Sequence, residues 1–596
     1  MQTVSQSWKD NQNNTLVGES DIEISLKMTD PDAYEDASAE SNGEVAFSDS
    51  NYIVSDGDKN IRPYATMERN QWILDGSREI VPDSNYGETG YVGSYFSNDD
   101  KYFDTNPIID VSFTKVHNNI LQGITIRWSE FLSEYAEEFI ITAYNGNSVV
   151  ATKTVIGNTD VLTIVEMDIS GYNKISVEII KWSMASRRAR IDELYIGVYK
   201  IFSKKDVFSY EVSHTVDPIS AELPKSEISF SIDNVEDVYD PYNAKGLSKY
   251  LMERQEINVR YGYKLSGMTE WIKGGKYYIS EWDAAQDGLS ADFKARDILE
   301  FMTGTYYRGL YNPNGTSLYD LAQDVLLDAD LPINSDGSVK WVIDEKLKNI
   351  KTVAPLPIDT HANCLQMIAN AGCCVLYQDR EGILHIEKFD IDARTAEDYH
   401  ISFFNSYSKS SLSLSKPLKQ VDVPCYSYSV VETSSELYTG TISLNGTMDV
   451  YITYSGSASN VSVTVTGGTL NSAAYYTNAC VLNITATSSV TVKVKGYTLN
   501  QSSVLITIPS GENGEAVSVD NPLITSQDVA TNVGYWIERY MRNRMTIGSE
   551  WRADPRLDAI DVIYSENDYG ENNMLMTNVK YKYNGAFRGS GEGRVI

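Results

Sequence analysis

The chain has 596 residues, of which 42% are hydrophobic and 22% are charged, and its formal net charge at pH 7 is −32. A chain of this length and apolar content can bury several cores, so a wholly disordered protein is excluded and about three to five domains are expected. Nucleic-acid binding is also excluded, because it requires Lys and Arg to neutralise phosphates, which an acidic chain repels.

Neither a secretory leader nor a membrane span is expected. The first residues, MQTVSQSWKDNQNN, lack the basic and apolar regions of a signal peptide. No run approaches about 18 consecutive apolar residues, the length that a membrane-spanning helix needs. We therefore expect a protein that is made and assembled inside a cell, or one that is released from it without the secretory route.

The first predicted element is a strand over residues 21–28 (DIEISLKM), where apolar and polar residues alternate. An acidic stretch rich in Ser, Asn and Asp follows at about 30–60 and predicts an extended loop. Within it, Asp56, Asp58 and Asn60 match the beginning of a calcium-binding loop. The glycine and the glutamate that such a loop requires are missing, so we expect a solvated turn.

Residues 78–200 predict a β-sandwich, because several short strands follow one another without helical periodicity. Between the strands 139–144 and 148–152, Asn145-Gly146 is typical of a two-residue hairpin turn. The pattern therefore predicts a self-contained module with only β structure.

This sandwich contains a set of aromatic and arginine residues that could bind a glycan: Trp128, Tyr144, Trp182, Arg187 and Arg188. Aromatic faces can stack on sugars, and Arg donates forked hydrogen bonds to hydroxyls or carboxylates. In the alternative interpretation, the tryptophans belong to the core and the arginines are solvated.

Helical periodicity first appears after residue 315. Apolar residues at 318, 321, 322, 325 and 326 predict a helix with Ser317 as its N-cap. A second helix is predicted from Thr360 to Gly372, followed by a hairpin whose turn is formed by residues 379–382. A third is predicted from Ser526, and strands are predicted at 551–562 and 574–583.

Residues 437–510 differ sharply in composition from the rest of the chain. Only three charged residues occur there, Asp449, Lys493 and Lys495, and Ser and Thr are abundant. Alternation at 461–465 and 490–494 predicts strands. We expect a small, inserted, Ser/Thr-rich β-sandwich, with no partner indicated.

No catalytic, cofactor-binding or metal-binding motif is present, so we predict a protein that is not an enzyme. The five histidines are scattered, and neither H-E-x-x-H nor G-x-S-x-G occurs. The cysteines are odd in number and lack zinc-site spacing, which predicts buried thiols: Cys364, Cys373, Cys374, Cys425 and Cys480.

The order of motifs from Ser226 to Val562 resembles the baseplate hub and tail-tip proteins of tailed bacteriophages. The resemblance to the first hub domain lies in the segments 226–232, 239–243, 260–262, 275–279 and 295–297. The two helices and the hairpin of 318–386 resemble the next hub domain. Residues 519–524 and 553–562, with the helix between them, resemble the closing domain, and 78–200 is similar to galactose-binding-type jelly rolls.

The predicted fold class is therefore mainly β with some α+β, in a multidomain hub. The division expected is 1–77 with 201–305 as the first hub domain, 78–200 as an inserted jelly roll, 306–400 as an α+β domain, 401–436 with 511–596 as the closing domain, and 437–510 as a second insert.

The resemblance implies a structural subunit of a phage tail tip. Such a subunit would form a homotrimer in the virion, assembled in the host bacterial cytoplasm, that continues the tail tube and lets DNA pass. Its partners would be tail-tube and distal tail proteins, spike or fibre proteins, and a host surface polysaccharide. Two alternatives stay open at this point: a glycan-binding adhesin, and an enzyme that cleaves cell-wall polymers.

Overall fold

The structure is a computed structural model that describes residues 1–29, 33, 36–54, 63–75, 78, 89–118, 121–235, 237–243, 248, 251–265, 268–284, 288–329, 331–332 and 338–596. Strands make up 54% of the chain and helices 12%, which confirms the predicted β-rich, multidomain class. The residues 56, 58 and 60 of the calcium-like pattern lie outside the described residues.

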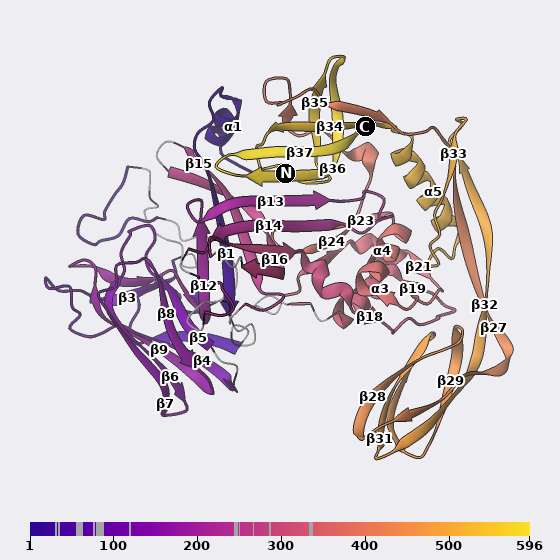
Figure 1. The fold of residues 1–596 in the computed structure, drawn as a ribbon, viewed down its shortest axis with the longest axis horizontal. Coiled ribbons are helices and arrows are strands. Elements are labelled where there is room, and N and C mark those ends of the chain that lie inside the picture. Colours follow the sequence, from indigo (N-terminus) through magenta and orange to yellow (C-terminus); the bar gives the residue numbers. More distant parts are fainter. Residues whose placement is uncertain are drawn as a thin grey trace.

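A 13-stranded sheet runs through the centre of the molecule (Figure 1). Its strands come from both ends of the chain. Along the main path their order is β12 (Gly197–Ser203), β1 (Ser20–Thr29), β15 (Glu256–Leu265), β16 (Met268–Ala284), β17 (Ser290–Arg296), β14 (Lys225–Asp233), β13 (Val207–Thr215), β36 (Gly570–Tyr583), β37 (Phe587–Val595), β34 (Met545–Arg552) and β26 (Ser411–Leu414). β35 (Val562–Asn567) pairs with β36 and with β25 (His400–Ile401).

The predicted strand at 21–28 is confirmed as β1, which lies between β12 and β15. Ile24 is opposite Phe202 on one side and Val259 on the other. Ile22, Ile24 and Leu26 are fully buried. Alternate residues of a strand share a face, so these three apolar residues all face the core.

β13 and β36 join the two ends of the chain into one sheet. They pair without interruption from Tyr210 opposite Tyr583 to Thr215 opposite Asn578. β13 also pairs with β14, so its backbone is bonded on both sides. Val212 and Tyr581, which face each other across this ladder, are fully buried.

The module predicted to be a jelly roll, called the jelly roll below, has its own core. One sheet has the order β2 (Ala37–Ser41), β4 (Ile108–His117), β9 (Tyr172–Trp182), β6 (Ala136–Asn145) and β7 (Ser148–Ile156). A second has β11 (Glu193–Tyr195), β5 (Leu121–Arg127) and β8 (Leu162–Ile169), and β10 (Arg188–Ile191) pairs with β3 (Tyr91–Phe96). The predicted hairpin is confirmed, with Asn145 opposite Ser148 and Gly146 at a φ of 58°.

Part of the acidic stretch at 30–60 belongs to this jelly roll and is not simply a loop. β2 pairs with β4, and the 3-10 helix η1 (Asn51–Val54) buries Ile53 and Val54 in the jelly-roll core. The expected division had placed these residues with the first hub domain. β2 has the sequence ASAES, which is too short and too polar to show strand alternation.

The α+β unit packs beside the central sheet. Its elements are η4 (Ile298–Thr303), β18 (Thr305–Tyr306), β19 (Thr316–Ser317), α3 (Leu318–Asp328), β20 (Trp341–Ile343), η5 (Glu345–Asn349), β21 (Lys351–Thr352), β22 (Asp359–Thr360), α4 (His361–Ala371), β23 (Cys374–Gln378), β24 (Leu384–Lys388) and η6 (Ile391–Ala393). Both predicted helices are confirmed, and both begin at a hydroxyl N-cap, Ser317 for α3 and Thr360 for α4.

A long two-stranded ribbon leads from the body to the second insert (Figure 1). It consists of β27 (Leu418–Ser443) and β32 (Ser489–Pro509), with β33 (Glu515–Ser518) beside its base. α5 (Gln527–Met541), the third predicted helix, packs against this base. The insert itself adds β29 (Ala458–Thr466) to the ribbon and has a second sheet of β28 (Gly446–Thr453), β31 (Ala479–Ala486) and β30 (Thr469–Tyr475).

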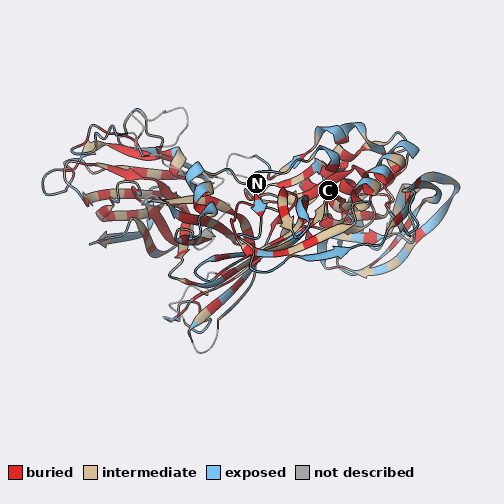
Figure 2. Ribbon diagram, turned by 90° about the horizontal axis from the view of Figure 1, so that it is seen from above, coloured by how far each residue is buried: buried red, intermediate tan, exposed pale blue. Residues whose placement is uncertain are grey.

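Exposure differs strongly between these parts. Buried residues concentrate in the central body and the jelly roll, whereas the middle of the ribbon is mostly exposed (Figure 2). All five cysteines are free, and four are buried; the exception is Cys425, which lies half-buried on the ribbon. Among the described residues, no helix is long and apolar enough to span a membrane.

Two segments differ from the predicted elements. The strand expected at 551–562 ends at Arg552, and residues 553–561 form a loop that leads to β35. In this loop Asp554 accepts hydrogen bonds from the side chains of Trp8 and Arg556, and the bond from Trp8 joins the loop to the N-terminal part of the chain.

The N-terminal helix α1 (Gln6–Asn13), capped by Ser5, was not predicted because its composition is almost wholly polar.

The junction of β13 and β36 can be tested at Glu211, whose side chain is partly exposed and pairs with Lys582. We expect Glu211→Pro to weaken the fold, because proline removes a ladder hydrogen bond and orphans a buried carbonyl at a cost of about 1–3 kcal/mol. Glu211→Ala is the matched control and should change stability little. Denaturant unfolding of the full chain measures both; equal stability of the two variants would contradict the role of this ladder.

Candidate functional site

The structure separates the five residues predicted to bind a glycan. Trp128 and Trp182 are fully buried, and their rings meet edge to face with centroids 5.9 Å apart. Neither ring presents a face to a sugar. Both tryptophans therefore lie in the jelly-roll core, as the alternative interpretation expected.

Arg187 is buried beside them and is held by Glu134. Its Nε donates to Glu134 Oε1 at 2.7 Å, and the indole Nε1 of Trp182 donates to Glu134 Oε2 at 2.9 Å. Arg187 Nη1 also donates to the carbonyl oxygen of Arg69, at 2.5 Å. A buried guanidinium is tolerated only when paired in this way, so this arginine fastens the loop at 63–75 to the jelly roll.

Arg188 and Tyr144 are half-buried, and Tyr144 lies far from the tryptophans. Arg188 Nη1 donates to the carbonyl oxygens of Gly93 and Ser94, and its guanidinium lies 4.0 Å from the ring of Phe96. Tyr144 is paired with Lys174, eight residues along β9 from Trp182 and so roughly 26 Å away. The five residues do not form one site, and a glycan-binding role for this module stays a prediction.

The role of Glu134 can be tested by Glu134→Ala, which leaves the guanidinium of Arg187 and the indole of Trp182 without their acceptor. We expect the jelly roll to lose about 3–5 kcal/mol, because an uncompensated charge stays buried. Glu166→Ala, which removes an exposed carboxylate from β8, is the control and should be near neutral. Calorimetric unfolding of the full chain is the measurement, and unchanged transitions for Glu134→Ala would contradict the assignment.

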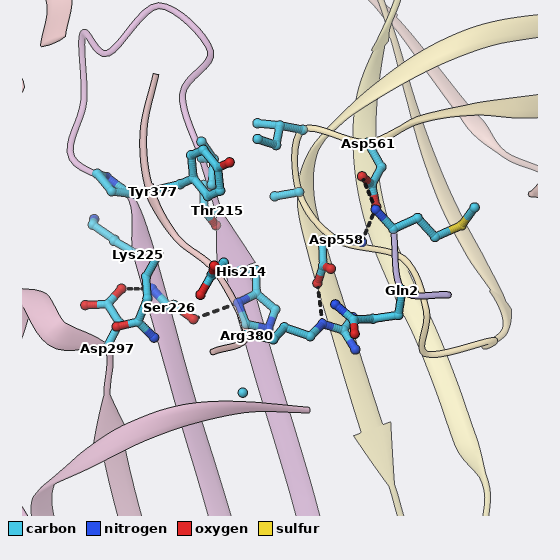
Figure 3. A pocket seen from close by; sticks show the side chains of 18 of the residues that line it. Gln2, His214, Thr215, Lys225, Ser226, Asp297, Tyr377, Arg380, Asp558 and Asp561 are labelled. Atoms are coloured by element: carbon cyan, nitrogen blue, oxygen red, sulfur yellow. Dashed lines mark hydrogen bonds and ion pairs between the residues drawn. The ribbon is translucent and has the colours of Figure 1, made fainter. Parts of the chain in front are cut away.

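A cleft of about 320 Å³ opens where the central sheet, the β23–β24 hairpin and the loop before β35 meet (Figure 3). Its charged lining includes Lys225, Asp297, Arg380, Asp558 and Asp561. Parts of the chain that are hundreds of residues apart in sequence meet here. We therefore consider it as a candidate functional site.

Arg380, at the turn of the predicted 379–382 hairpin, crosses this cleft. Its Nε donates to Asp558 Oδ1 at 2.7 Å. The other two guanidinium nitrogens donate to the carbonyl oxygens of Lys273, at 2.7 Å, and Leu557, at 3.0 Å. Sequence analysis missed this arginine, because its partners lie more than 100 residues away and no local pattern marks it.

His214 lies against Ser226 and Tyr277 at the end of β13. Ser226 Oγ is 2.6 Å from His214 Nδ1, and Tyr277 OH is 3.3 Å from His214 Nε2. Burial lowers the pKa of His214 to about 4, so the ring is neutral near pH 7. Ser226 can then donate to Nδ1 while Nε2–H donates to Tyr277, which in turn donates to the carbonyl oxygen of Gly274.

Two carboxyl groups in the cleft have raised pKa values. Burial raises the pKa of Asp297 to about 7, although its carboxyl accepts hydrogen bonds from the backbone N–H groups of Leu299 and Ser226. Burial and the nearby Asp558 raise the pKa of Asp561 to about 6. Asp561 also accepts a hydrogen bond from the amino group of Met1, at 2.8 Å.

The contact between Ser226 and His214 has the distance of a nucleophile and its base. A base with a pKa near 4 is poorly matched to neutral pH, and the second ring nitrogen faces a tyrosine instead of an orienting carboxylate. In the described part of the chain, no group of three or more His, Cys, Asp or Glu side chains is placed to hold a metal ion. The geometry therefore favours a polar junction between structural units.

No family model and no curated protein matches this chain. Among solved structures it is similar to the 43 kDa tail protein of prophage MuSo2 from Shewanella oneidensis, at 11% identity and a TM-score of 0.37, covering 67% of this chain and 95% of that one. It is also similar to the tail protein from Neisseria meningitidis MC58 (8%, TM-score 0.38, 67% and 93%) and to prophage tail protein gp18 from Listeria monocytogenes EGD-e (11%, TM-score 0.35, 67% and 91%). All three TM-scores lie below 0.5, so the similarity is distant.

The raised pKa of Asp297 predicts a pH dependence of stability. Between about pH 4 and pH 7 the folded state keeps this proton while the unfolded state releases it, so stability falls as pH rises and levels off above pH 7. Asp297→Asn removes this dependence. The stability of the variant relative to the parent should increase between pH 4.5 and pH 8, by on the order of 3 kcal/mol.

His214 makes the opposite contribution, because its lowered pKa makes stability rise over pH 4–6.5. Both the parent and Asp297→Asn contain His214, so this contribution cancels when their stabilities are compared at the same pH. Asp292→Asn, at an exposed position of β17, is the control and should show no such trend. Denaturant midpoints at the two pH values are the measurement. If the difference in stability between Asp297→Asn and the parent is the same at both pH values, Asp297 is ionised at both, which would contradict the prediction.

Proposed function

We propose that this chain is a structural subunit of the tail tip or baseplate hub of a tailed bacteriophage. In this role it continues the tail tube, lets DNA pass and presents modules that bind the host surface. The proposal rests first on the order of hub-like motifs from Ser226 to Val562. The observation that carries it is that β13 and β36 unite the two outer hub-like segments in one sheet.

The placement of the two inserts supports a presenting role. The jelly roll and the Ser/Thr-rich insert lie at opposite ends of the long axis, on either side of the central sheet (Figure 1). Each leaves the body and returns to it through paired strands: β1 with β12, and β27 with β32. Both inserts can therefore project from a rigid body without interrupting it.

The charge of the chain supports DNA passage. A net charge of −32 repels phosphates, so DNA can move along an acidic lumen without sticking to it. The cleft at Arg380 fits a structural role, because Arg380 is bonded to Asp558 and to backbone carbonyls, and His214 is bonded to Ser226 and Tyr277. We propose that this junction holds the units together and performs no catalysis.

The proposed partners follow from the tail-tip role. The chain forms a homotrimer that contacts tail-tube and distal tail proteins on one side and spike or fibre proteins on the other. It assembles in the cytoplasm of the host bacterium and resides in the virion. A host surface polysaccharide is the proposed external ligand.

The assembly state is the test of this proposal. We expect mass photometry of the purified chain, with and without the tail-tube protein of the same phage, to show a particle of three times 66.6 kDa. Negative-stain images of that particle should show threefold symmetry and a central channel. Monomers alone under both conditions would contradict the proposed function.

A further inference from the structure

The second insert has a polar face that is mostly exposed to solvent. In the sheet of β28, β31 and β30, the inward residues form the core of the insert, and Ile452, Leu482 and Ile484 are buried. The outward residues form cross-strand pairs, with Asp449 opposite Asn483 and Thr447 opposite Thr485. Asp449, Thr447 and Thr485 are exposed, so this face meets solvent.

Side-chain hydrogen bonds fix the polar groups of this face in place. Asn471 Nδ2 donates to Asn483 Oδ1 at 2.8 Å and lies 2.8 Å from Thr485 Oγ1. Asn483 Nδ2 donates to Asp449 Oδ1 at 2.6 Å, and Thr485 Oγ1 is 2.7 Å from Thr447 Oγ1. Amides, hydroxyls and a carboxylate that hold one another in this way lose little side-chain freedom when a ligand binds.

An aromatic residue borders the polar network. Tyr451 lies two residues beyond Asp449 on the same face of β28, about 6.8 Å along the strand, and is 58% exposed. The ring of Tyr307, from the α+β unit, lies 5.2 Å away and tilted by 41°. The two rings make an apolar wall at the end of the row of polar groups.

The two tyrosine rings are held in place because hydrogen bonds join the insert to the α+β unit, to which Tyr307 belongs. The backbone N–H of Thr477 donates to the carbonyl oxygen of Gly309, and its hydroxyl accepts from the N–H of Tyr311. Asn478 Nδ2 donates to the carbonyl oxygen of Leu356. These contacts set the position of β28 relative to Tyr307, so the aromatic wall is preformed.

The charge of the insert indicates the kind of ligand. Asp449 is the only acidic residue in 437–510, and the two lysines lie on β32, in the other sheet of the insert. The rest of the chain is strongly acidic and repels polyanions. A ligand that approaches this face is therefore favoured if it is uncharged and rich in hydroxyl groups.

We propose that the outer face of β28, β31 and β30 is a binding site for a neutral glycan, seated on Tyr451 and hydrogen-bonded by Asp449, Asn483 and Asn471. A sugar ring offers an apolar C–H face to the tyrosine and hydroxyls that both donate and accept, which matches a carboxylate beside primary amides. The biological setting, a tail tip at a host surface, rests on the proposed function. The binding chemistry does not depend on it.

The experiment is binding of the full chain to an array of neutral and anionic bacterial polysaccharides, followed by titration of the strongest neutral probe. We expect the parent chain to bind at least one neutral glycan. Tyr451→Ala and Asn483→Ala should each weaken that binding roughly tenfold or more. Tyr451→Phe keeps the ring and should stay within a fewfold of the parent.

Two controls locate the site. Thr464→Ala removes an exposed hydroxyl from β29 in the opposite sheet, and Tyr144→Ala removes the half-buried ring from the jelly roll. Both should leave binding unchanged. A parent chain that binds no neutral glycan, or a loss of binding in Tyr144→Ala but not in Tyr451→Ala, would overturn the proposal.

The variants are also examined by mass photometry, which separates this proposal from the function proposed above. Trimers that fail to bind any neutral glycan would refute the glycan site alone. Glycan-binding monomers would refute the tail-tip assembly and leave the site intact. Tyr451 and Asn483 lie at the surface of the insert, so their substitution leaves its core unchanged.

Discussion

The antiparallel pairing of β13 with β36 joins the first and last parts of the chain, and the other units depend on the sheet that it completes. β13 is bonded on both sides, so the sheet continues from the strands near the N-terminus to those near the C-terminus. The hairpin with Arg380 and the loop with Asp558 then meet across its edge. Without this pairing, the two halves would be separate domains with two additional open sheet edges.

The same arrangement explains how two large inserts are accommodated. The jelly roll is inserted between β1 and β12, which are neighbours in the sheet, and the second insert lies between β27 and β32, which pair along most of their length. In both cases the chain leaves and returns at adjacent points, so the insertion costs little closure entropy. The inserts can then differ in composition from the body. The second insert has only three charged residues between 437 and 510, whereas the whole chain has a net charge of −32.

Buried arginines hold together segments that are far apart in the sequence. Arg187 joins the loop at 63–75 to the jelly roll through Glu134 and a backbone carbonyl, and Arg190 binds Glu68 of the same loop. Arg380 does the same between the hairpin and the loop before β35. A buried ion pair adds little net stability compared with apolar packing, but separating its partners is costly. Such pairs therefore define which surfaces meet, and this requirement explains Arg187, one of the two arginines that the glycan hypothesis had assigned to sugar binding.

The sequence by itself determined the features that depend on neighbouring residues. Alternation located β1, helical periodicity with the N-cap Ser317 located α3, and Asn145-Gly146 located a hairpin, because each depends on a few neighbouring side chains. Only the tertiary structure decided which faces are covered. Trp128 and Trp182 lie in the core, whereas Tyr451 is exposed, although all three lie on or next to strands of similar pattern. Burial depends on what packs against a face, and for Arg380 and Asp558 that contact joins residues 178 positions apart.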